Sequence, residues 1–301
     1  MSTPLPALAC DTHMHFYDST YPIASTTVLT PPDATVADYQ QLQSQLGCRR
    51  VVVVQPSTYG LDNSCQLDAM AELRSSPLGI DNSTPPSADD SATDPTDRVN
   101  PINRTDLIRG IAVVNSDTSR QELERLHGLG VRGARFHMLP GGAVDWEHLD
   151  PVVAAIAEFE WHIQLQLNGR ELAEREPQLH GFPLVIDHVG RYMPPVNLND
   201  PSFDALRRLL ESGSVWVKIS APYESSVDGP PSYDDTAVLA QALVEQYPER
   251  CLWATNWPHP GQKSPPSATD LAELVEQWIP AEHRQRILVN NPTQTYGFDR
   301  Y

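Results

Sequence analysis

Short apolar runs alternate along this chain with longer stretches whose apolar residues recur every three or four positions. The first pattern is typical of buried strands and the second of amphipathic helices. We predict strands at residues 7–15, 48–55, 109–114, 130–137, 161–168, 183–188, 214–220 and 250–256. We predict helices at residues 36–46, 119–129, 150–159, 203–212 and 236–247, each ending near a glycine or a proline.

Strands that alternate with helices through a whole chain indicate parallel β/α units, and eight of them favour an α/β fold closed into a (β/α)8 TIM barrel. A doubly wound open sheet is the alternative. The chain has 301 residues, 40% of them hydrophobic, which suits one barrel domain over residues 1–301. Residues 75–103 are rich in Pro, Ser, Asp and Thr without any period, so we expect a flexible surface insertion before the third strand.

The charge balance narrows the choice of partners. The chain carries 39 acidic and 21 basic residues, a net charge of −18, which argues against nucleic acid or an anionic membrane as a partner. Its four cysteines lie scattered without metal-binding spacing and indicate reduced thiols. No leader-like start or membrane-spanning run occurs, so we expect a cytoplasmic protein. No face of the pattern identifies an oligomer interface.

Polar residues recur at every second position near the ends of the predicted strands. In a barrel, one such set per strand points inward, and chemistry is found at the carboxyl ends. One polar residue at a strand end is more often structural, but convergence from seven strands predicts an active site. The predicted inward sets are Asp11, His13 and His15; Val53, Gln55 and Ser57; Gly133, Arg135 and His137; His162, Gln164, Gln166 and Asn168; Leu184, Ile186 and His188; Trp216, Lys218 and Ser220; Ala254 and Asn256.

Four motifs together resemble a known family. They are Asp-Thr-His-Met-His at 11–15, Val-Ile-Asp-His-Val-Gly-Arg at 185–191, Leu-Trp-Ala-Thr-Asn-Trp-Pro-His-Pro at 252–260 and Ile-Leu-Val-Asn-Asn-Pro at 287–292. The set resembles the amidohydrolase superfamily (amidohydrolase-related family 2), in the branch of 2-pyrone-4,6-dicarboxylate hydrolase, sulfomuconolactone hydrolase and the sugar-acid lactonases. The likeness covers the chain from the first strand to the end, apart from 75–103.

The resemblance implies a barrel in which His13, His15, His188 and an aspartate at position 256 surround the reacting carbonyl. This chain has Asn256 instead. An amide cannot take a proton from water as a carboxylate does. We therefore expect little activity by the family mechanism, as in an active-site Asp-to-Asn variant, or else altered chemistry or a binding role.

A metal centre needs separate treatment. If one ion is bound, the ligands are His13, His15 and His188, a set that suits Zn²⁺. The predicted fourth strand offers Arg135 in place of a bridging residue, and Asn256 gives no anionic ligand. We therefore predict a site without a metal or other cofactor, in which the histidines polarise the carbonyl by hydrogen bonding.

The predicted substrate is a small lactone with one or more carboxylates. Arginine at a strand end binds a carboxylate through two parallel hydrogen bonds, and we assign that role to Arg135 and Arg191, with Lys218 nearby. Salt bridges to Asp11, Asp187 or loop glutamates are the structural alternative, which we prefer for Arg132. The predicted substrate-binding residues are Gln55, Ser57, Tyr59, Arg135, His137, Gln166, Arg191, Ser220, Tyr223 and His259.

The predicted reaction is hydrolysis of the lactone ring by a carboxylic ester hydrolase. Three alternatives remain at this point. A lactone isomerase passes the acyl group to a hydroxyl of the same substrate, and a decarboxylase of the same superfamily needs a firmly bound metal. The third is a pseudoenzyme that binds a dicarboxylate without turnover.

Overall fold

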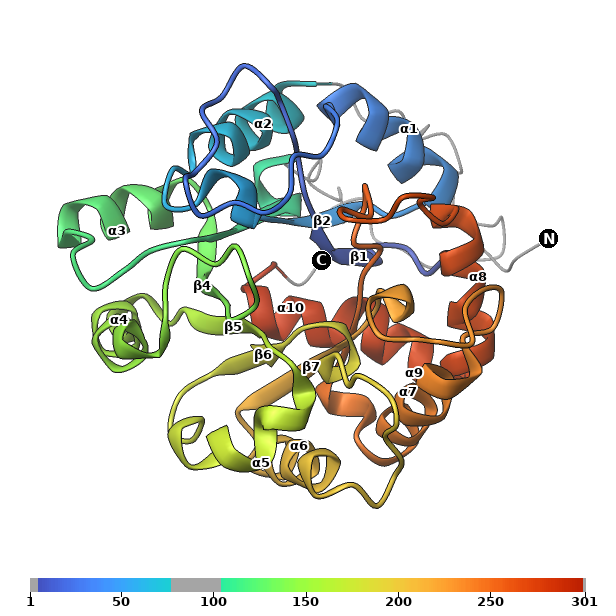
Figure 1. Ribbon diagram of the computed structural model, residues 1–301. Coiled ribbons are helices and arrows are strands. Elements are labelled where there is room, and N and C mark those ends of the chain that lie inside the picture. Colours follow the sequence, from blue (N-terminus) through green and yellow to red (C-terminus); the bar gives the residue numbers. More distant parts are fainter. Residues whose placement is uncertain (1–4, 77–103, 300–301) are drawn as a thin grey trace, which may run out of the picture.

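The computed structural model describes residues 5–76 and 104–299. Eight parallel strands pair there in chain order, with helices outside them, which confirms the predicted (β/α)8 barrel (Figure 1). Every observed strand overlaps its predicted range. The strands are Cys10–Met14 (β1), Arg50–Val54 (β2), Ile108–Ala112 (β3), Val131–His137 (β4), His162–Gln166 (β5), Leu184–Ile186 (β6), Val215–Ile219 (β7) and Cys251–Trp253 (β8).

The helices surround the strands, and all five predicted ones are present. Further helices that the sequence pattern did not predict are α2, α5, α8, α9 and α10. The helices are Val36–Leu46 (α1), Ser64–Ser75 (α2), Arg120–Gly128 (α3), Leu149–Ile156 (α4), Leu172–Arg175 (α5), Pro201–Glu211 (α6), Asp234–Gln246 (α7), Ala268–Trp278 (α8), Ala281–Gln285 (α9) and Asn291–Tyr296 (α10). Helix α1 begins with a capping box between Thr35 and Asp38.

The backbone hydrogen bonds that close the barrel onto β1 come from the residues just after β8, not from β8 itself. The amide of Asn256 donates to the His13 carbonyl and the amide of His15 donates to the Trp257 carbonyl, each at 2.8 Å. Met14 and Trp257 form an isolated parallel bridge. Residue 256 therefore lies directly against His13 and His15, although 240 residues separate them in the chain.

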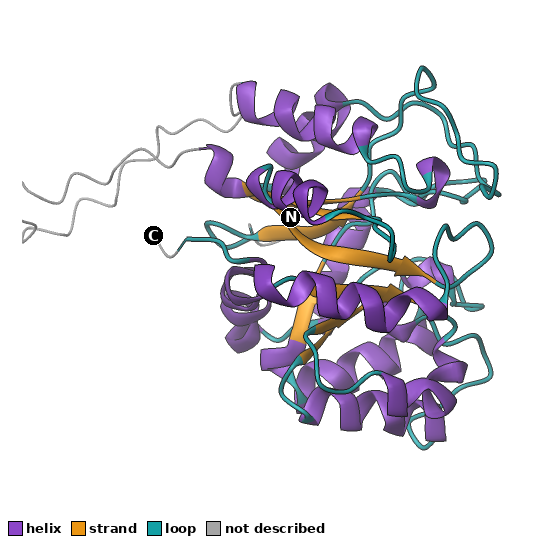
Figure 2. Cartoon of the chain, turned by 90° about the vertical axis from the view of Figure 1, so that its left-hand side faces the viewer, coloured by secondary structure: helices purple, strands orange, loops and turns teal. Residues whose placement is uncertain are grey.

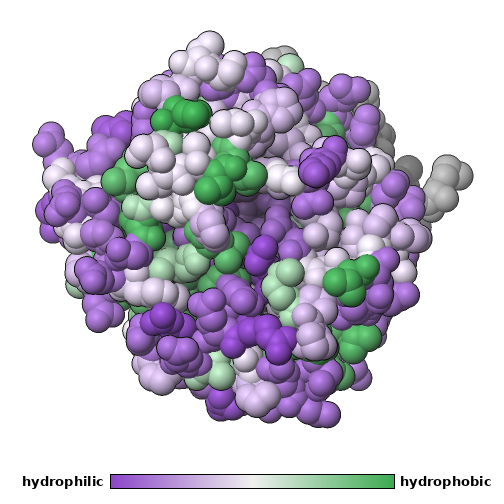
Figure 3. Space-filling view, viewed as in Figure 1, coloured by the Kyte–Doolittle hydropathy of each residue, from purple (hydrophilic) through white to green (hydrophobic). Residues whose placement is uncertain are grey.

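Apolar side chains fill two layers. The larger lies between the strands and the surrounding helices, while a smaller cluster inside the barrel includes Val52, Val54, Val185, Trp216 and Tyr296. Figure 2 shows the long loops gathered at the carboxyl ends of the strands. In the view into that carboxyl end, the centre is hollowed and lined by hydrophilic residues (Figure 3).

The predicted alternation of inward and outward side chains is observed in β4, β5 and β7. It was wrong in three other strands. In β1 the register shifts between Asp11 and Met14, so a bulge breaks the alternation. Asp11 faces α1, where it accepts a hydrogen bond from Tyr39. In β2, Val52 and Val54 face inward, and Val53 faces the helices.

The prediction for β6 was wrong by one residue. Leu184 and Ile186 pack against the helices, while Val185 belongs to the inner cluster. Asp187, at the next inward position, contacts His13. This strand is only three residues long, so its sequence is too short to fix which face is inward.

Three other predictions concern the chain as a whole. The predicted insertion at 75–103 lies outside the described residues from position 77 onward. All four cysteines are buried and free, as expected for reduced thiols. Across the described ranges, every helix is too short or too polar to cross a membrane.

Candidate active site

His13 of β1 and His15, which follows the strand, lie at the mouth of the barrel in contact with each other. His13 Nε2 is 3.1 Å from His15 Nε2, and His15 Nδ1 is 2.8 Å from the carbonyl oxygen of Val54. Burial holds the pKa of both rings well below the usual range, so both are neutral. A carbonyl oxygen only accepts, so His15 Nδ1 is the donor there and its Nε2 accepts from His13. His13 Nδ1 is then an acceptor.

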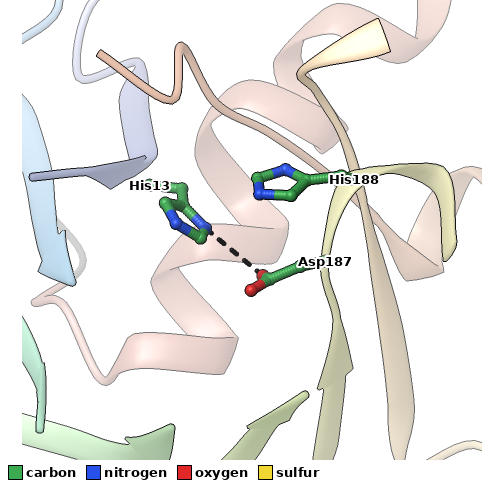
Figure 4. A group of neighbouring side chains, drawn as sticks. All are labelled: His13, Asp187 and His188. Atoms are coloured by element: carbon green, nitrogen blue, oxygen red, sulfur yellow. Dashed lines mark hydrogen bonds and ion pairs between the residues drawn. The ribbon is translucent and has the colours of Figure 1, made fainter. Parts of the chain in front are cut away.

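A carboxylate, an ammonium and an amide gather around His13 Nδ1. Asp187 Oδ1 lies 3.3 Å from His13 Nδ1 (Figure 4). Lys218 Nζ lies 3.2 Å from the same nitrogen and 3.3 Å from Asp187 Oδ1. Gln164 Nε2 donates to Asp187 Oδ2 at 3.2 Å. We call His13, Asp187, Lys218 and Gln164 the paired side of the mouth. In this group the buried charges of Asp187 and Lys218 compensate each other.

The pKa values of the two ions follow from this arrangement. Burial alone raises the pKa of Asp187, but the neighbouring Lys218 ammonium holds it well below its usual range. Burial lowers the pKa of Lys218 to about 8, although Asp187 opposes this shift. The sequence predicted Lys218 as a cation at the mouth, near the two arginines. In the structure it is fully buried and paired with Asp187.

His188 reaches the same space from a turn. His188, Val189 and Arg191 have φ of 54°, 55° and 49°, a left-handed conformation that is uncommon for residues other than glycine. The turn brings the His188 ring to 4.7 Å from that of His13, and Figure 4 shows the two rings side by side. His188 Nδ1 lies 2.9 Å from the Ser220 hydroxyl.

The ring of His188 is neutral because burial lowers its pKa to about 3. A neutral imidazole has one donor and one acceptor nitrogen. If the Ser220 hydroxyl donates to Nδ1, then Nε2 carries the hydrogen. Among the described residues this Nε2 has no hydrogen-bond partner, so His188 can donate to a ligand in the mouth.

The side chain of Asn256 lies in a second group at the mouth. Its Nδ2 donates to the Tyr223 hydroxyl at 2.9 Å, and that hydroxyl lies 2.9 Å from His259 Nδ1. Asn256 Oδ1 and His259 Nε2 are buried, and neither has a partner in the described part of the chain. Both residues have positive φ, 57° and 64°. Burial lowers the pKa of His259 to about 4. We call Tyr223, Asn256 and His259, with the adjacent Glu224, the open side of the mouth.

The two arginines assigned to substrate binding differ in their partners. Arg135 is buried and donates to the Gln55 carbonyl and to Gln166 Oε1, both at 2.7 Å. No carboxylate of the described residues forms a salt bridge with it. Arg191 instead pairs with Glu224 at 3.2 Å, which is the structural alternative considered from the sequence. His137 Nδ1 lies 3.1 Å from Gln166 Oε1, next to Arg135.

Within the described part of the chain, three predicted substrate-binding residues form no hydrogen bond with the histidines. The Gln55 amide donates to the carbonyls of Gly60 and Asp62 in the following loop. Ser57 and Tyr59 lie in that loop as a 3-10 turn. The Tyr59 hydroxyl is bonded to the backbone of Asp18. In this conformation these side chains support the loop after β2.

Asp187 and Glu224 were not among the predicted site residues, whereas Gln164 and Lys218 were predicted to point inward, with Lys218 as a cation at the mouth. Gln164 and Lys218 had the right alternation, so their inward position was predictable. The signal for Asp187 was its place immediately before His188 in the chain. The predicted alternation in β6 placed Asp187 on the outer face, so its inward position was missed. Nothing in the local sequence of Glu224 indicates its partner, which lies 33 residues away.

His13, Asp187 and His188 also form the kind of group that can hold a metal ion, with ligand atoms within 4.8 Å of one another. Two observations on the donor set argue against a divalent ion. The Lys218 ammonium already contacts His13 Nδ1 and Asp187 Oδ1, where it would repel a second cation. Position 256 offers a neutral amide in place of an anionic ligand, although the imidazoles themselves are ordinary zinc ligands. The residues therefore fit a divalent ion poorly.

The chain is similar to known proteins over most of its length. Residues 10–298 match the family described as Amidohydrolase. The chain is 32% identical to 4-sulfomuconolactone hydrolase of Hydrogenophaga intermedia, over 97% of this chain and 90% of that protein. It is 30% identical to D-galactarolactone isomerase of Agrobacterium fabrum, over 97% and 92%. It is 31% identical to the 2-pyrone-4,6-dicarboxylate hydrolase of Comamonas testosteroni, over 97% and 91%.

A solved structure agrees in fold. The apo crystal structure of a protein from Agrobacterium tumefaciens superimposes with a TM-score of 0.83 at 29% identity, covering 99% of this chain and 98% of that one. The likeness to known proteins therefore runs through the whole barrel, including the strand ends that carry the histidines.

Proposed function

Since this chain belongs to the amidohydrolase family, we propose that it is a lactonase, a carboxylic ester hydrolase that opens the ring of a small carboxylated lactone. The observation that carries the proposal is the convergence of three buried, neutral histidines, His13, His15 and His188, at the carboxyl end of the barrel. Two of the relatives are named as hydrolases of cyclic esters.

The histidines polarise the carbonyl group of the lactone. A neutral donor that faces the carbonyl oxygen stabilises the oxyanion that forms when the carbonyl is attacked. His188 Nε2 is the best placed donor because Ser220 occupies its other nitrogen. His13 and His15 lie beside it, and the pair with Asp187 and Lys218 fixes the His13 ring.

Arg135 indicates that the substrate carries a negative charge. Since Arg191 and Lys218 already pair with Glu224 and Asp187, Arg135 is the cation near the histidines that pairs with no described carboxylate. Its Nε is buried without a partner. We expect Arg135, with His137 beside it, to bind one substrate carboxylate. Ser220, Tyr223, Gln166 and His259 would orient the ring.

A lactone isomerase is the second candidate, and one observation favours it. A relative at 30% identity is named D-galactarolactone isomerase. An isomerase needs no water, because a hydroxyl of the substrate attacks the carbonyl. The same histidines would polarise the same carbonyl, so the two reactions differ only in the nucleophile.

The proposal is tested with a panel of pyrone dicarboxylates and sugar-acid lactones. The unaltered chain and Asn256→Asp are both assayed, with products identified by mass spectrometry. Ring opening with the gain of one water supports the hydrolase, and a product of unchanged mass supports the isomerase. If neither protein converts any lactone, the histidines bind a ligand without turnover and the lactonase proposal is abandoned.

A further inference from the structure

Hydrolysis requires a base to take a proton from water, and position 256 holds an amide. The buried carboxylates near the strand ends are the candidates for this base. Asp11 accepts hydrogen bonds from Thr255, Tyr39 and the His13 amide, so both of its oxygens are engaged. Asp187 is fully buried and paired with Lys218. Neither can approach a water molecule in the mouth.

Glu224 differs from both in its exposure and in its bonding. Its side chain is 17% exposed, against 0% for Asp187. Arg191 Nε holds Oε2 at 3.2 Å, while Oε1 has no hydrogen-bond partner among the described residues. One oxygen therefore fixes the carboxylate and the other is free for a water molecule.

Glu224 directly follows Tyr223, the hydrogen-bond partner of Asn256, in the chain. It ends the short 3-10 helix Pro222–Glu224 (η8), which directly follows β7 and begins after Ala221 at a left-handed φ of 47°. The preceding residue, Tyr223, accepts the hydrogen bond from Asn256. Glu224 and Asn256 are thus neighbours of the same tyrosine at the same end of the barrel.

The electrostatic setting suits a base. Burial raises the pKa of Glu224 above its ordinary value, and Arg191 and Arg135 only partly oppose the shift. A carboxylate with a raised pKa is a stronger base and remains ionised at neutral pH beside a cation. His259 is the competing candidate, but burial lowers its pKa to about 4 and makes it a weak base.

We propose that Glu224 is the general base of this chain, taking the place of the carboxylate missing at 256, with Arg191 as its positioning residue. The proposal rests on the lactonase function. A water molecule gives its proton to Glu224 Oε1 while its oxygen bonds to the lactone carbonyl carbon. The bond from that carbon to the ring oxygen then breaks, and the ring oxygen takes the proton back from Glu224. The products are a free carboxyl group and a hydroxyl group on one open chain.

The test uses Glu224→Gln, which keeps the shape of the side chain and removes the base. We expect kcat on a lactone that the unaltered chain hydrolyses to fall by about 10²–10⁴-fold, the usual contribution of a general base. Glu176→Gln is the matched control, because Glu176 is 14% exposed and also paired with an arginine, Arg208, away from the mouth. The control should keep its activity within about twofold.

A second variant separates catalysis from structure. In Glu224→Gln with Asn256→Asp, a carboxylate returns to position 256, and we expect at least a tenfold recovery of kcat over Glu224→Gln alone. Loss of fold would not be rescued in this way. Arg191→Met should move the acidic limb of the pH–rate profile to higher pH, since the cation that lowers the pKa of Glu224 is gone.

The outcomes distinguish this proposal from the lactonase function itself. If the unaltered chain hydrolyses lactones and Glu224→Gln matches it within twofold, Glu224 is not the base but the function stands. If only Asn256→Asp is active, the base must sit at 256 and the Glu224 proposal is overturned. If no variant converts a lactone, the function fails first.

Discussion

The two sides of the barrel mouth differ in whether their buried polar groups have partners. On the paired side, Asp187 and Lys218 neutralise each other, and Gln164 and His13 complete their hydrogen bonds. On the open side, Asn256 Oδ1 and His259 Nε2 are buried without described partners, and both residues have left-handed backbones. Glu224 keeps one carboxylate oxygen free.

The difference indicates a division of labour. A buried ion pair with complete hydrogen bonds is costly to break and holds its members in one geometry. Unmatched polar atoms and strained backbone persist where a ligand completes them. We infer that the paired side fixes the histidines, while the open side meets the water and the substrate.

Removal of the cation should damage the paired side most. In Lys218→Met, Asp187 stays buried with its compensating charge gone, and we expect a loss of about 3–5 kcal/mol in the free energy of unfolding. Urea denaturation measures it. Lys263→Met, at an exposed position, should change stability by less than about 0.5 kcal/mol. A loss below about 1 kcal/mol in Lys218→Met would show that Asp187 is not held as an ion.

Replacement of His188 should affect catalysis. Asparagine tolerates the left-handed backbone of this position, so His188→Asn keeps the turn and removes the ring. We expect kcat to fall by about 10²–10³-fold, the usual effect of losing an oxyanion donor. His180→Asn, half exposed and outside the mouth, is the control. Unchanged kcat in His188→Asn would remove His188 from the mechanism.

Loss of one hydroxyl should test the open side. Tyr223→Phe leaves Asn256 Nδ2 and His259 Nδ1 without their partner, and we expect a loss of about 1–3 kcal/mol in stability. Thermal or urea unfolding measures it. Tyr247→Phe removes an exposed hydroxyl bonded to Glu211 and serves as the control. Equal effects of the two changes would mean that the Tyr223 bonds add nothing.

The charge of Lys218 should set the alkaline limb of the activity. Its pKa is lowered to about 8, so the side chain is charged below that pH and neutral above it. Above pH 8 the ammonium is lost, and with it the group that holds Asp187 and His13. We expect kcat to fall about tenfold for each pH unit above 8. A profile that stays flat from pH 7 to 10 would contradict this role.

Metal removal should have the smallest effect. The Lys218 ammonium and the neutral amide at position 256 fit a divalent ion poorly, so dialysis against a chelator should leave the activity unchanged. Plasma emission spectrometry of protein purified without chelator measures the metal content. Stoichiometric zinc, with activity lost on its removal and regained on its return, would refute this prediction and favour a metal-dependent reaction.

Much of the fold was predictable because local patterns carry it. Apolar runs of strand length predicted all eight strands, and the helix periodicity predicted α1, α3, α4, α6 and α7. Helix α2 was missed because its buried positions include a glutamine, Gln66, which obscures the apolar period. The alternation in β1 and β6 failed where a bulge and a short strand with a left-handed turn override it.

The order of apolar and polar residues is enough to predict the barrel and to place His13, His15 and His188 at strand ends. Which charges form pairs depends instead on how the chain folds. Lys218, predicted as a cation at the mouth, pairs with Asp187, and Arg191, predicted to bind a substrate carboxylate, pairs with Glu224. Such pairing depends on the closure of the barrel and on turns after β6 and β7, which bring together residues that are 31 and 33 positions apart. Charge partners at that range leave no periodic signal in a sequence.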